Sequence, residues 1–119
     1  MNKLWFAALG MVLTLSACSD GGSKYADRFD ALVPPGWTLD ATTGSIKDKC
    51  TASVDCGSIE RRYYLNTDLA SATDAMEQFY PKQRCLAKRE GNGVGVDCAD
   101  VHLSISVTTE TASITMTKR

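Results

Sequence analysis

Cysteine is the residue type whose number and spacing in this chain point to chemistry. The sequence holds five cysteines, and four of them form two local pairs, Cys50 with Cys56 and Cys85 with Cys98. Five residues separate the first pair and twelve the second, whereas common zinc motifs place about two to four residues between paired ligands. The spacing therefore favours disulfides within each pair over a metal site. Four cysteines can pair in three ways, and the spacing does not exclude the two pairings other than this one.

The chain offers few other groups for catalysis. Its single histidine, His102, falls among serines on the solvent side of a predicted strand, so we expect a surface side chain. Gly91-Asn92-Gly93 precedes no helix, which favours a hairpin turn over a phosphate-binding loop. Asp97 and Asp100 could bind a cation, but the sequence offers them no third ligand. We therefore expect no enzyme activity, no metal and no cofactor.

The N-terminal residues follow the plan of an export signal. Lys3 precedes a nearly unbroken apolar run of twelve residues, Leu4 to Leu15. A membrane-spanning helix needs about 20 apolar residues, so this run is too short to cross a bilayer and suits the core of a signal peptide. An ordinary signal peptide, cut after a small residue, is one interpretation, but it would favour a small side chain where Leu15 stands.

The next residues, Leu15-Ser16-Ala17-Cys18, resemble the lipobox of bacterial lipoproteins. The resemblance implies cleavage before Cys18, a diacylglyceryl thioether on its sulfur and, in many bacteria, a further acyl chain such as palmitate on the new N-terminus. One acyl chain binds a membrane only weakly, whereas two or three hold a protein there stably. In the sorting rule of this family, Ser19 rather than aspartate after the cysteine implies the outer membrane, with the domain facing the periplasm.

The domain organisation follows from this resemblance. Residues 1–17 would be the signal peptide, 18–23 the lipidated cysteine with a polar tether, and 24–119 a single globular domain. Lipid on Cys18 leaves an even number of cysteines in an oxidising compartment, which also favours two disulfides. Pro34-Pro35-Gly36-Trp37, the cysteine pairs and a helix between them resemble other small bacterial lipoproteins, a likeness that implies no activity.

Two helices are predicted beyond the tether. Apolar residues recur at helical spacing within Lys24 to Val33, and Pro34-Pro35-Gly36 ends this short amphipathic helix. Its apolar face comprises Tyr25, Phe29 and Leu32. The main helix is expected over Ser71–Tyr80, with Ser71-Ala72-Thr73-Asp74 as a capping box and Pro81 beyond its end. Its core-facing stripe comprises Leu69, Ala72, Met76 and Phe79.

The segment between these helices is predicted to be extended. Trp37, expected in the core, opens a run that turns at Gly44, and Ser45 to Cys50 follows as a short strand. Alternation from Ile59 to Leu65 predicts a half-buried strand. Within it, Arg61-Arg62-Tyr63-Tyr64 gathers residue types that are enriched at interfaces. Alternation divides this cluster between two faces, which makes Arg61 a charged member of the inner face.

The last third of the chain is predicted to be a β-meander, because its apolar residues alternate with a period of two. A two-residue turn at Gly91-Asn92 places Cys85 opposite Cys98, at a Cα separation of about 4.5 Å that a disulfide tolerates. The inward parity changes at Ala99-Asp100, which predicts a turn or a bulge there, and again near Thr109 to Thr111, which predicts a turn.

These elements predict an α+β fold: an antiparallel sheet of about five to seven strands, one main helix packed on it, a short N-terminal helix and two local disulfides. A net charge of −1 without a basic patch argues against nucleic acid as a partner. We expect a non-enzymatic envelope lipoprotein, attached to the membrane by its lipid, that binds an envelope protein or polymer or has a structural role. The alternative is a periplasmic inhibitor of a secreted hydrolase.

Overall fold

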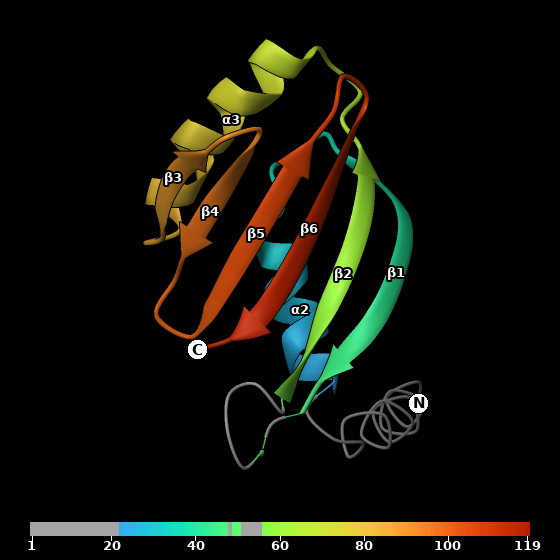
Figure 1. The fold of residues 1–119 in the computed structure, drawn as a ribbon, viewed down its shortest axis with the longest axis vertical. Coiled ribbons are helices and arrows are strands. Elements are labelled where there is room, and N and C mark those ends of the chain that lie inside the picture. The colour runs from blue at the N-terminus through green and yellow to red at the C-terminus, as the bar shows by residue number, and fades with distance from the viewer. Residues whose placement is uncertain (1–21, 48, 51–55) are drawn as a thin grey trace, which may run out of the picture.

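The structure is a computed structural model of the chain, and it describes residues 22–47, 49–50 and 56–119. They form one six-stranded antiparallel sheet with two helices packed on it (Figure 1). The predicted α+β fold is therefore confirmed, and the strand number lies within the expected range. In chain order the elements are α2 (Gly22–Ala31), β1 (Thr38–Ile46), β2 (Gly57–Tyr64), α3 (Leu69–Lys82), β3 (Leu86–Glu90), β4 (Gly93–Asp97), β5 (Val101–Val107) and β6 (Thr111–Lys118).

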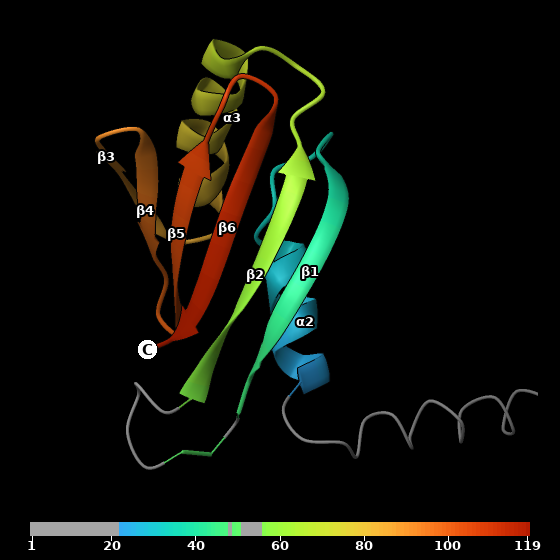
Figure 2. The ribbon, with the colours of Figure 1, turned by 45° about the vertical axis from the view of Figure 1, so that its right-hand side comes forward.

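The sheet has the strand order β1-β2-β6-β5-β4-β3. Strands β3 to β6 form the predicted meander, and turns lie between its strands at both predicted places. The last strand, β6, pairs with β2 on one side and β5 on the other, so it joins the two halves of the sheet. Figure 2 shows that α2 and α3 lie on the same side of the sheet, so no helix of the described residues covers the other side, which is called the uncovered face.

The core lies between the helices and the sheet. Alternate residues of β2, β5 and β6 point into it, as their period-two burial shows. The predicted apolar face of the first helix is confirmed, because Tyr25, Phe29 and Leu32 are all buried. Trp37 packs against the core as expected, and its ring lies 6.2 Å from that of Tyr63.

The start of α3 differs from the prediction. The helix begins at Leu69, and its N-cap is Asp68, whose carboxylate accepts a hydrogen bond from the Ser71 backbone N–H at 2.7 Å. Aspartate caps helices as well as serine does, so the earlier cap adds a turn that contains Leu69. The same hydrogen bond holds the pKa of the Asp68 carboxyl below its ordinary value.

The buried stripe and the end of α3 also differ from the prediction. The fully buried side chains are Ala72, Met76 and Tyr80, whereas Leu69 is 37% exposed. Pro81 lies inside the last turn and does not end the helix. Proline removes one backbone donor, but the N–H groups of residues 83, 84 and 85 still bond to the Tyr80 and Pro81 carbonyls and close the helix end.

Gly44 does not form the predicted turn. It lies inside β1, opposite Ile59 of β2, with a φ of 86° that favours glycine. A Cβ atom here would collide with the Ser58 carbonyl oxygen across the sheet. The predicted strand from Ser45 to Cys50 is consequently only the last two residues of β1, and Asp48 lies outside the described residues.

Tyr80 links the two helices, and its hydroxyl should measurably stabilise the fold. The side chain is fully buried, and the hydroxyl donates to the Leu32 carbonyl oxygen at 2.8 Å. We expect Tyr80→Phe to lower the free energy of unfolding by about 1–2 kcal/mol, because a buried carbonyl loses its donor. Urea unfolding measures this, and the exposed Tyr64→Phe should change stability by less than about 0.5 kcal/mol. Equal effects of the two changes would contradict the prediction.

Candidate functional site

The structure describes four of the five cysteines of the chain. Cys18, the predicted site of lipidation, lies outside the described residues, as does the segment 51–55. The four remaining cysteines form the two expected bonds, Cys50–Cys56 and Cys85–Cys98, with Cα separations of 5.3 and 4.4 Å. These sulfurs are therefore structural cross-links in the described part of the chain.

The Cys85–Cys98 disulfide confirms the predicted hairpin register. Glu90 pairs with Gly93, so the turn lies at Gly91-Asn92 rather than at the commoner Asn92-Gly93. The backbone N–H of Cys85 donates to Tyr80 and that of Cys98 to Val101, not to each other. The cysteines thus face each other as a non-hydrogen-bonded pair, whose closer Cα atoms suit a disulfide.

The two aspartates near His102 both hydrogen-bond to basic side chains. His102 Nδ1 lies 2.7 Å from an Asp97 carboxylate oxygen on the uncovered face of the sheet, and this hydrogen bond lowers the pKa of Asp97. Asp100 accepts two hydrogen bonds from the guanidinium of Arg28, at 2.9 and 3.0 Å. Among the described residues no three candidate ligands come together to hold a metal ion. Asp97 and Asp100 therefore serve as partners of basic side chains.

The arginine and tyrosine cluster of β2 divides between the two faces as predicted. Arg61 and Tyr63 are buried, while Arg62 and Tyr64 are exposed. The Arg61 guanidinium lies 4.6 Å from the centre of the Phe29 ring, donates to Tyr63 and forms an ion pair with Asp30. Burial acts to lower the pKa of Arg61, but the bonds to Tyr63 and Asp30 outweigh it and leave this pKa above its ordinary value.

Arg61 is 8% exposed, and its Nε has no hydrogen-bond partner in the described part of the chain. Removing its charged partner by Asp30→Asn should lower the free energy of unfolding by about 2 kcal/mol, because the buried cation keeps its desolvation cost. Arg61→Met should change stability by less than about 1 kcal/mol, since it removes the charge and keeps the volume. Chemical denaturation compares the two, and a larger loss for Arg61→Met would contradict this account.

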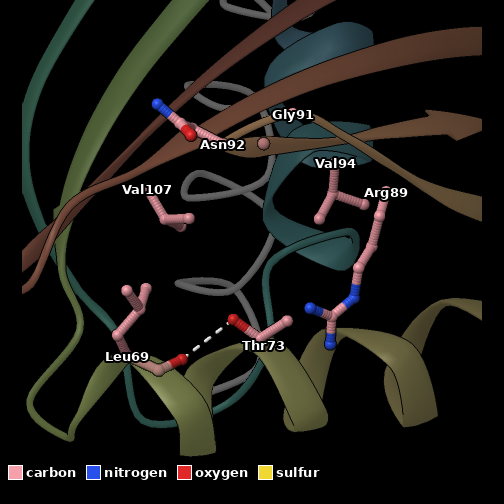
Figure 3. A pocket seen from close by; sticks show the side chains of 8 residues that line it. Leu69, Thr73, Arg89, Gly91, Asn92, Val94 and Val107 are labelled. Carbon is pink, nitrogen blue, oxygen red and sulfur yellow. Dashed lines mark hydrogen bonds between the residues drawn. The ribbon is translucent and has the colours of Figure 1, made fainter.

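A hollow lies between the first turns of α3 and the β3–β4 turn (Figure 3). Figure 3 shows side chains of α3 and of the sheet facing each other across it. Its apolar lining comes from Leu69, Val94 and Val107, and its polar lining includes Thr73 and Arg89. Its volume of about 220 Å³ lies below the roughly 300–1,000 Å³ typical of ligand pockets.

Two polar side chains of this hollow already have partners. The Thr73 hydroxyl donates to the Leu69 carbonyl within the helix, and Arg89 Nε donates to the Glu77 carboxylate at 2.9 Å. The hydrogen bond to Glu77 raises the pKa of Arg89, and the nearby charge of Asp74 acts in the same direction. Two carboxylates beside one guanidinium disfavour an anionic ligand, so this hollow is a weak candidate for a binding site.

The uncovered face of the sheet offers a broader candidate surface. Register places side chains of all six strands on it, and most are small and carry hydroxyl groups. The serines and threonines of this face are Thr38, Thr43, Ser45, Ser58, Ser104, Ser106, Thr111, Ser113, Thr115 and Thr117. Small side chains keep such a face flat and open, which suits contact with an extended partner.

Two hollows lie along β2 on this side. The first is lined by Ala41, Thr43, Glu60, Arg62 and Ser113, from β1, β2 and β6. The second lies at the end of the same strands and is lined by Tyr64, Asn66, Thr67, Thr109 and Glu110. Alternation in the sequence indicates which residues of β2 point outward. Their neighbours lie about 20 and 50 residues away in the sequence, and only the strand order of the sheet brings them beside β2.

No protein-family model, curated protein or solved structure matches this chain. Among the helices of the described ranges, none is long and apolar enough to cross a membrane. Function is therefore inferred from the chain's own residues.

Proposed function

We propose that this chain is a lipid-anchored lipoprotein of the bacterial cell envelope whose domain is a non-enzymatic binding module. The observation that carries the proposal is Leu15-Ser16-Ala17-Cys18 at the end of a twelve-residue apolar run. The cysteine pairing adds support, because the two disulfides use every other cysteine and leave Cys18 as the odd one. An acyl group on that sulfur would account for it.

The anchor would hold the domain close to the membrane. The first helix begins at Gly22, four residues after Cys18, and four residues of chain reach at most about 14 Å. The start of α2, the end of β6 and the Cys50–Cys56 bond share one end of the sheet (Figure 1). That end would face the lipid headgroups, with the surface along β2 beside it. Ser19 favours the outer membrane as the site of attachment.

A binding role suits the shape of the described surface. The uncovered sheet face is broad and has small polar side chains, so it fits an extended envelope protein or polymer. An inhibitor of a secreted hydrolase would instead need a segment that projects into the enzyme's cleft. The broad exposed face is thus the observation that favours the binding module over the inhibitor.

Globomycin, which blocks the peptidase of bacterial lipoproteins, tests the anchor. Treated cells should accumulate a heavier precursor that retains residues 1–17, and mass spectrometry of untreated protein should show an acylated Cys18 at the N-terminus. An unrelated secreted protein with an ordinary signal peptide serves as the control and should be unaffected. Unchanged mobility together with an unmodified N-terminus would refute the anchor.

A further inference from the structure

The uncovered face along β2 has hydrogen-bonding groups that the fold leaves unused. Glu60 lies between Thr43 of β1 and Thr115 of β6, and Arg62 lies next to Ser113 of β6. Within the described residues, the Glu60 carboxylate and the hydroxyls of Thr43, Ser113 and Thr115 have no protein hydrogen-bond partner. A hydroxyl both donates and accepts, and a carboxylate accepts. This surface can therefore pair with a ligand rich in hydroxyl groups.

Tyr64 adds an apolar platform to the same line of residues. It follows Glu60 and Arg62 on the outward side of β2, and it is 44% exposed although it is a large aromatic residue. One hollow contains Arg62 and the next contains Tyr64, so the ring stands beside both. From Glu60 to Tyr64 the strand runs about 13 Å, which is the length of a short oligosaccharide.

The charges of this surface disfavour an anionic ligand. Arg62 is the one cation that lines either hollow, and its Nε is paired with Asp40 at 2.8 Å. Glu60 and Glu110 add negative charge, one in each hollow. An anionic polymer would meet these carboxylates without a free cation to compensate, whereas an uncharged one would meet hydroxyls, a carboxylate acceptor and an aromatic ring.

We infer that the face along β2 binds a neutral oligosaccharide. The apolar face of one sugar ring stacks on Tyr64, since aromatic rings pair an apolar body with a polar tip, and its neighbours place vicinal hydroxyls on Glu60, Thr43 and Ser113. The inference deepens the proposed function, because it names the class of polymer that the binding module recognises.

Titration with chitotriose, a neutral trisaccharide, tests the inference on the chain purified from cells in detergent. Amide NMR signals should shift saturably at millimolar ligand and should cluster on β1, β2 and β6. Tyr64→Ala should weaken binding about fivefold or more. Leu86→Ala is the matched control, because Leu86 is 66% exposed and its register places it on the same face at the far edge. This control should leave affinity unchanged.

The outcomes separate this inference from the proposed anchor. An absence of saturable shifts, shifts scattered outside the three strands, or equal weakening by both variants would overturn it. Shifts that depend on protein concentration alone would show a second copy on this face and would overturn it too. The mass of the same sample reports acylation, so an unmodified chain that binds chitotriose would refute the anchor and support the oligosaccharide site.

Discussion

Replacing Cys18 with serine is expected to abolish the incorporation of labelled palmitate into the chain. A serine hydroxyl cannot form the thioether that carries the diacylglyceryl group, because the thiolate is the nucleophile. Without acyl chains the domain also loses the hydrocarbon contacts that hold it, at about 0.8 kcal/mol for each buried methylene. Labelling of growing cells followed by purification of the chain measures the change from full to no incorporation.

The double variant Cys85→Ala/Cys98→Ala is the control for this experiment, because it removes two cysteines and leaves Cys18 in place. Its labelling should equal that of the unaltered chain. Label retained by Cys18→Ser would place the acyl group elsewhere and contradict the lipobox interpretation. The fraction of protein in the outer membrane should fall in parallel with the label.

The same double variant should lose about 3 kcal/mol of unfolding free energy. Its disulfide spans 13 residues, and closing a loop of this size stabilises a fold by about 3 kcal/mol in the chain-entropy model. Both cysteines are buried, and Cys85 lies three residues beyond the end of α3. The bond therefore ties the main helix to the hairpin. Since small domains have about 5–15 kcal/mol of stability in all, this loss is a large fraction.

Urea unfolding at matched protein concentration measures this effect. Leu86→Ala provides a reference, since it changes an exposed neighbour and should shift the free energy by less than about 0.5 kcal/mol. Reduction of the unaltered chain opens Cys50–Cys56 as well, so it should lower the free energy of unfolding by at least as much. A double variant as stable as the unaltered protein would show that the cross-link contributes nothing to the fold.

Local patterns predicted the elements in which two independent signals agree. The β3–β4 hairpin has both a cysteine spacing and a glycine-rich turn, and a single register satisfies the two. The inner face of β2 was also predictable, because alternation alone places Arg61 on the same face as Tyr63. The partner of Arg61 was not, since Asp30 lies 31 residues earlier on a separate helix.

The structure differs from the predicted elements where one local sequence pattern is compatible with two conformations. Asp68 and Ser71 are both good caps, and the helix uses Asp68, whose carboxylate accepts from the Ser71 N–H. A glycine at positive φ can turn the chain or let two strands approach, and Gly44 does the second. The surface along β2 was beyond sequence reasoning, because it needs β1, β2 and β6 side by side.

The position of β6 has a consequence for when the protein can fold. It is the last strand along the sequence, yet it is the link between the β1–β2 pair and the three strands that precede it. While the chain is still emerging from the ribosome, the two halves have no shared strand and the core stays open. If the chain is exported as proposed, it would complete its core only after β6 has crossed the membrane, where oxidants could close its disulfides.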